Sequence, residues 1–150
     1  MKLKVPPAVV FLVFVLLMYL LAELLPVGYF DFFGRYFLMY ALGGIAGIVG
    51  VWAVLQFMVS KTSIDPTKPA GASVLVTGGL YQYSRNPMYL ALLLMLFTWS
   101  LFLGNAFNVL LAAGFVGYMN KFQVIPEEEV LLGIFGKEYT QYCALVRRWF

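Results

Sequence analysis

The densest group of side chains in this sequence that could do chemistry lies within residues 76–89. This stretch contains two glycines, an arginine, an asparagine and three tyrosines, and it leads directly into a long apolar segment. Glycines let main-chain N–H groups approach a ligand closely, and tyrosine rings can hold an aromatic base. Taken singly, the glycines could form a plain turn and the arginine could be a snorkelling anchor at a membrane boundary. Their combination favours one wall of a cofactor site at a membrane surface.

A second polar cluster lies at residues 123–129, where Gln123 precedes Pro126 and three glutamates. Proline suits the first turn of a helix, and acidic residues there interact favourably with the helix dipole, so a solvated helix start is the default interpretation. Beside a lipid surface a carboxylate is more costly. Pairing of one glutamate with Arg85, or with hydroxyls of a ligand, would satisfy it.

The composition places the whole chain in a membrane-embedded class. Hydrophobic residues make up 63% of the 150 residues and charged residues only 11%, whereas soluble domains have about 25% charged residues. We therefore expect a single membrane domain over residues 1–150. The net charge of +3 is too small to indicate a nucleic-acid partner.

The same composition restricts the chemistry. The sequence has one cysteine, Cys143, and no histidine. We therefore expect no metal site, and histidine, the commonest general base, cannot take part in a reaction. Any reaction must use carboxylates, amides, hydroxyls, arginine or a bound cofactor.

Long uncharged runs predict an all-α membrane protein with four transmembrane helices. The runs cover residues 5–22, 36–60 and 86–120, and the last is divided by a Gly104-Asn105 turn. The tail repeats apolar residues at three- and four-residue spacings, as in an amphipathic helix at the membrane surface, and Gly136 interrupts this helix. The predicted spans are about 6–25, 35–59, 87–103 and 106–123, followed by a C-terminal helix at about 126–147.

Charge distribution orients these spans. With four spans, nine of the ten lysines and arginines fall on one side and only Arg35 on the other, which predicts a multi-pass protein with both termini in the cytoplasm. The two polar clusters then meet at the cytoplasmic end of the last helical hairpin.

Small residues at four-residue spacings line two helix faces. Gly43 and Gly47 share one face of the second predicted span, as do Ala46 and Gly50, and Ala113 and Gly117 recur in the fourth. Such faces let helices approach closely, either within one chain or in a homodimer.

The two polar clusters together resemble the signature of the integral-membrane methyltransferases, the isoprenylcysteine carboxyl methyltransferase and phospholipid methyltransferase family. The similarity covers roughly residues 62–150, and the chain is most similar to the short bacterial members. It is carried by Thr77-x-Gly79-x-Tyr81 with Ser84-Arg85-Asn86-Pro87-Met88-Tyr89, and by Glu127-Glu128-x-x-Leu131-x-x-x-Phe135-Gly136-x-x-Tyr139-x-x-Tyr142, which closes with Val146-Arg147-Arg148-Trp149.

The resemblance implies a membrane enzyme, here of a bacterial inner membrane, that uses S-adenosylmethionine as methyl donor. The acceptor would be a lipophilic small molecule reaching the donor from the membrane lipids. Arg85, Asn86 and Glu128 would be the catalytic residues. The donor-binding residues implied are Val76, Thr77, Gly79, Leu80, Tyr81, Ser84, Arg85, Asn86, Tyr89, Gln123, Glu127 and Glu128.

The resemblance leaves the acceptor open. Relatives that methylate carboxylates tend to carry an arginine just before the glutamate pair, where this chain has Gln123-Val124-Ile125-Pro126. For an amine acceptor, Glu127 or Glu128 is the candidate base. Two other classes compete: a small four-helix transporter or scaffold dependent on Glu23, and a reductase using a nicotinamide cofactor, for which the chain is short.

Overall fold

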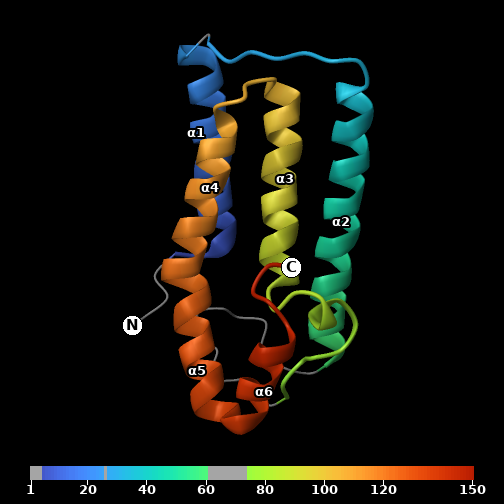
Figure 1. Ribbon diagram of the computed structural model, residues 1–150, viewed down its shortest axis with the longest axis vertical. Helices are drawn as coiled ribbons and strands as arrows, with labels where there is room; N and C mark the ends of the chain where they lie inside the picture. The colour runs from blue at the N-terminus through green and yellow to red at the C-terminus, as the bar shows by residue number, and fades with distance from the viewer. Residues whose placement is uncertain (1–4, 26, 61–73) are drawn as a thin grey trace.

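The computed structural model describes residues 5–25, 27–60 and 74–150, and all regular secondary structure in these ranges is helical (Figure 1). Four helices run alternately up and down, and the two C-terminal helices lie at one end of them. The class predicted from the sequence is therefore confirmed as all-α. Four of the nine cations used to orient the chain, Lys2, Lys4, Lys61 and Lys68, lie outside the described residues.

Two helices are long and apolar enough to cross a membrane: α1, Pro7–Leu24, and α2, Arg35–Val59. Proline at the start of α1 has no N–H to leave unpaired, and Gly34, at φ 89°, allows the sharp entry into α2. Both bounds agree with the predicted 6–25 and 35–59 to within one residue.

The other half of the predicted bundle is shorter. Helix α3 spans Pro87–Leu103, as predicted, but it has only 17 residues, and α4, Asn108–Met119, has 12 where 106–123 was predicted. Gly104, at φ 65°, makes the turn between them. The chain does not leave the helical path after α4, because the π-helical turn η3, Asn120–Val124, connects it directly to α5, Ile125–Phe135.

The predicted C-terminal helix over 126–147 is interrupted at Gly136, as its sequence indicated, and the interruption divides it into two separate helices. Helix α5 ends at Phe135 and a separate helix, α6, covers Lys137–Leu145. Gly136, with φ 51° and ψ −116°, separates them, a backbone conformation that glycine adopts readily. The break turns α6 back beneath the helical bundle (Figure 1).

Helices α2 and α3 pack along much of their length through small residues. A Cβ built on Gly50 would lie 3.3 Å from the Ala91 Cβ, and Ala46 and Ala53 are almost fully buried. Part of the α2 small-residue face therefore packs within the chain. Ala113 and Gly117 of α4 are exposed, and the homodimer stays a prediction.

A second contact set joins α1, α3 and α4 around fully buried Met18, Leu96, Phe115 and Met119. At the far end of the bundle, buried Arg35 donates to the Phe30 carbonyl at 2.8 Å and to the Tyr36 hydroxyl at 2.8 Å. These contacts hold that end closed and leave the opposite end, where α5 and α6 lie, to form a site.

Candidate active site

The glycine-rich part of residues 76–89 forms a short 3₁₀ helix, η2, Gly79–Gln82, anchored to the last turns of α2. The Gln56 amide donates to the Gly78 carbonyl and accepts from the Leu80 N–H at 3.2 Å. Gln56 is therefore a positioning residue for this loop, and no motif in the sequence indicated it.

We expect Gly79→Ala to destabilise this loop. Gly79 has φ +57°, and a Cβ there would lie 2.5 Å from the Gln56 Oε1, so the side chain would displace the anchor as well as strain the backbone. Thermal unfolding in detergent should give a lower Tm than for Gly44→Ala, since Gly44 has open space around its Cα. Equal Tm values for the two variants would contradict this role of Gly79.

An aromatic cluster follows η2 and joins it to α6. Tyr81, Tyr139 and Tyr142 are buried together, and Phe57 of α2 packs against Tyr81 with 5.6 Å between ring centroids. The Tyr142 hydroxyl donates to the Tyr81 carbonyl at 2.6 Å. Burial raises the pKa of Tyr81 well above its ordinary value of 10.0, so its hydroxyl stays protonated and neutral.

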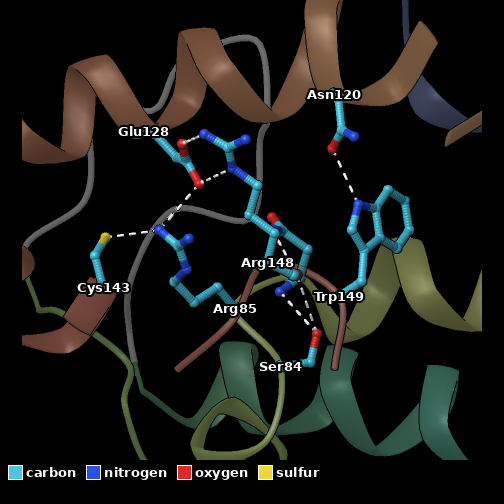
Figure 2. A network of polar contacts seen from close by, with 8 residues as sticks. Ser84, Arg85, Asn120, Glu128, Cys143, Arg148 and Trp149 are labelled. Atoms are coloured by element: carbon cyan, nitrogen blue, oxygen red, sulfur yellow. Dashed lines mark hydrogen bonds and ion pairs between the residues drawn. The ribbon is translucent and has the colours of Figure 1, made fainter. Parts of the chain in front are cut away.

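Figure 2 shows an ionic cluster in which two arginines meet one carboxylate. Arg148 binds Glu128 with both ends of its guanidinium, Nε to Oε1 at 2.9 Å and Nη2 to Oε2 at 2.7 Å. The Arg85 Nη1 lies 3.0 Å from the Glu128 Oε1 and donates to the Cys143 Sγ at 2.7 Å. Of the two partners considered for a glutamate, Arg85 or the hydroxyls of a ligand, the structure shows Arg85, and the glutamate is Glu128.

The C-terminal segment, residues 146–150, crosses between the two predicted clusters. The Arg147 carbonyl accepts from the Arg85 N–H at 3.0 Å, and the Arg148 carbonyl accepts from the Asn86 Nδ2 at 3.0 Å. The Ser84 hydroxyl donates to the same Arg148 carbonyl at 3.3 Å. Trp149 donates to the Asn120 Oδ1 at 3.0 Å, which fastens the segment to the start of η3 (Figure 2).

Glu127 differs from its neighbour in having no cation as partner among the described residues. Its Oε1 accepts a hydrogen bond from the Tyr89 hydroxyl. Burial, together with the nearby Glu128 carboxylate, raises the pKa of Glu127 from 4.5 to about 7, although the Tyr89 hydrogen bond opposes this shift. Glu127 can therefore gain or lose a proton near neutral pH.

These groups surround a cavity of about 690 Å³, within the range of small-molecule sites. One part is polar and aromatic, lined by Arg85, Glu127, Glu128, Tyr81 and Tyr139. The other part is apolar and lined by small residues and methionines of α2 and α3. Since the lining residues of α2 run from Ala46 to Phe57, the cavity extends roughly 16 Å along that helix. Its apolar lining includes Ala46, Gly47, Gly50, Val51, Ala91, Leu92 and Met95.

The structure brings the two predicted clusters together, with different roles for their members. Seven of the predicted residues line the cavity: Val76, Tyr81, Arg85, Asn86, Tyr89, Glu127 and Glu128. Ser84 and Leu80 support the loop from outside, while Thr77 and Gly79 are exposed. Gln123 is 1% exposed and donates to the Val5 carbonyl, so it lies behind the cavity wall.

Arg148 belongs to the closing part of the motif, Val146-Arg147-Arg148-Trp149, but it was not predicted to be a site residue. Its spacing of 20 residues from Glu128 gave no signal, because the break at Gly136 is what returns the chain to the site. Glu23, on which the transporter alternative depends, is exposed in the last turn of α1 and does not line the cavity.

The chain resembles known proteins over most of the residues that form this cavity. The model of the family described as phospholipid methyltransferase matches residues 35–138. The chain is 47% identical over 62 residues, 41% of its length, to an uncharacterized protein of Haemophilus influenzae, covering 98% of that protein. It is 30% identical over 90 residues, 60% of its length, to the protein-S-isoprenylcysteine O-methyltransferase of Schizosaccharomyces pombe, of which it covers 38%.

No solved structure matches this chain. The matched range 35–138 contains α2, the loop before α3, both helices of the hairpin and the glutamates of α5. It therefore includes every predicted site residue. Since the match extends over well more than half of the sequence, the chain belongs to the phospholipid methyltransferase family.

Proposed function

We propose that this protein transfers a methyl group from S-adenosylmethionine to a lipophilic acceptor held in the membrane. The observation that carries the proposal is the single cavity with a polar, aromatic part and an apolar part between α2 and α3. A water-soluble donor needs polar surroundings and a lipid-like acceptor needs apolar ones, and the two sites must adjoin for the methyl group to be transferred. Membership in a methyltransferase family supports the reaction type.

The polar part of the cavity fits the groups that the donor carries. Tyrosine rings suit an adenine, and the Glu127 carboxylate can accept hydrogen bonds from ribose hydroxyls or from an ammonium group. The Arg85 Nε is buried and has no hydrogen-bond partner in the described part of the chain, which suits a site whose ligand supplies a carboxylate. Residues 76–89 and α5 would therefore hold the donor.

The apolar part fits an acceptor with a hydrocarbon tail. Gly47 and Gly50 leave the α2 surface bare of side chains there, and Met88 and Met95 offer flexible apolar walls. A tail could lie along the cavity-facing surfaces of α2 and α3 with its reactive atom directed toward Glu127.

Bound S-adenosylmethionine would supply an electrophilic methyl on a sulfonium: the acceptor lone pair bonds to the methyl carbon while the carbon–sulfur electrons return to sulfur. The protein's contribution is alignment and exclusion of water, which can supply about 7–11 kcal/mol. If the acceptor atom carries a proton, Glu127 takes it. With Arg85 assigned to the donor and Arg148 bound to Glu128, the acceptor faces the Glu127 carboxylate, which favours an amine or hydroxyl acceptor over a carboxylate.

This function assigns an orientation to the helices. We propose that α1, α2, α3 and the α4–η3 segment cross the inner membrane of a bacterium, with both termini and the site in the cytoplasmic half. Two helices of sufficient length, the many exposed apolar side chains and the family support membrane embedding.

Calorimetry of the purified protein with S-adenosylhomocysteine tests the proposal. We expect saturable binding, weakened at least about tenfold in Arg85→Ala because a charge-assisted hydrogen bond is lost. Lys137→Ala, at an exposed position of α6, should bind like the wild type. Absence of binding by the folded wild-type protein would refute the proposal.

A further inference from the structure

Glu128 is shared unequally between its two arginines. Arg148 occupies both carboxylate oxygens in a bidentate pair, whereas Arg85 reaches only one of them, through a single nitrogen (Figure 2). Bidentate pairing is the stronger and more directional arrangement. The orientation of the Glu128 carboxylate is therefore set by Arg148.

Arg148 lies outside the cavity that it influences. It is absent from the cavity lining, its side chain is 41% exposed, and its carbonyl is held by Asn86 and Ser84. Any effect of Arg148 on a ligand in the cavity must be transmitted through Glu128 or through this backbone anchor.

Arg85, in contrast, lines the cavity with part of its guanidinium unused. Its side chain is only 13% exposed, and its Nη1 makes both of the polar contacts drawn in Figure 2. Within the described residues its buried Nε has no partner. A buried guanidinium N–H without a partner is costly, so the Nε suits an acceptor from a bound group, and a carboxylate is the acceptor with which guanidinium groups pair best.

Removing Arg148 would change the ion pair between Glu128 and Arg85. A carboxylate released from one arginine pairs more fully with the remaining one, and a bidentate Arg85–Glu128 pair would engage a second nitrogen of Arg85. Glu128 now faces two arginines, and without Arg148 this surplus of positive charge around its carboxylate would also disappear.

We infer that Arg148 is a positioning residue that holds Glu128 in place and so reserves Arg85 for the carboxylate of the methyl donor. This inference rests on the proposed function, because it assigns the anion to the donor. It also assigns different roles to the adjacent glutamates: Glu127 faces the ligand, and Glu128 orients the arginine that binds it.

The test compares two ligands, one with and one without the amino-acid end of the donor. S-adenosylhomocysteine carries the amino-acid carboxylate and 5′-methylthioadenosine lacks the amino-acid end altogether. We expect Arg148→Met to weaken binding of S-adenosylhomocysteine about tenfold in calorimetry and to change binding of methylthioadenosine less than about twofold. The matched control is Arg147→Met, which removes a neighbouring exposed arginine side chain with no polar contact among the described residues.

Arg148→Lys provides a second measurement that keeps the charge and the backbone anchor. A single ammonium cannot make the bidentate pair. The affinity of Arg148→Lys for S-adenosylhomocysteine should therefore lie between those of the wild type and Arg148→Met. Equal losses for both ligands would show a general structural defect and overturn the inference, as would unchanged binding in Arg148→Met. If the wild type itself binds neither ligand, the proposed function fails; if it binds both and Arg148 has no selective effect, only the inference fails.

Discussion

Glu127→Gln is expected to reduce methyl transfer at pH 7 by about 10²–10⁴-fold, the usual contribution of a positioned general base. Glutamine has the same shape and can still accept the Tyr89 hydrogen bond, so the cavity wall should be kept. What is lost is the ability to take a proton from the acceptor. The measurement is the rate of methyl transfer to membrane lipids from labelled S-adenosylmethionine.

The pH dependence identifies Glu127 as the group responsible. Its pKa of about 7 means that the wild-type rate should rise with pH below 7 and level off above it, while the residual rate of Glu127→Gln should be flat. Glu129→Gln, at an exposed position of the same helix, should keep the wild-type profile. A wild-type profile that persists in Glu127→Gln would exclude Glu127 as the base.

Stability should show the opposite trend. The folded pKa of Glu127 lies above its ordinary 4.5, so the protonated carboxyl stabilises the protein at low pH. That stability is lost as the pH rises from about 4.5 through about 7. Glu127→Gln should show a smaller fall in Tm over the same interval.

Glu128→Ala is expected to destabilise the protein by about 3 kcal/mol, because it leaves Arg85 and Arg148 facing each other without their shared carboxylate. Arg148 is partly solvated, which keeps the effect at the lower end of the range for broken buried pairs. Thermal or denaturant unfolding in detergent measures it. Glu129→Ala, whose side chain is exposed, should change stability by less than about 0.5 kcal/mol.

A double-mutant cycle separates pairing from packing. Arg148→Met combined with Glu128→Ala removes one of the two uncompensated arginines, so the double variant should be less destabilised than the two single effects added together. Strict additivity would mean that the pair contributes no coupling energy.

The sequence was most informative where the local pattern alone determines structure. Uncharged runs and their flanking prolines and glycines located α1, α2 and α3 within one residue. The hairpin between Asn86 and Asn120 was enough to bring Arg85 toward the glutamates, since both clusters leave it at the same end.

Features that depend on tertiary contacts could not be predicted. Nothing local to Gln56 indicates that its amide would hold a loop 22 residues later, and nothing near Arg148 indicates Glu128 as its partner. The predicted break between the hairpin and the C-terminal helix was also misplaced. Pro126 suggested a new start, but the preceding backbone continues into α5 as a π-helical turn. The interruption at Gly136, in contrast, was indicated by the glycine itself.

That π-helical turn makes α4, η3 and α5 one uninterrupted rod from Asn108 to Phe135. Glu127 is consequently fixed to the apolar helix below it and has no hinge with which to adjust its height. With the rod in a bilayer as proposed, the thickness of the hydrocarbon layer sets how far the carboxylate stands above the lipid headgroups. The bilayer also determines the depth of the acceptor. The lipid composition of the host membrane would then set the distance along the membrane normal between Glu127 and the acceptor, and so affect the reaction directly.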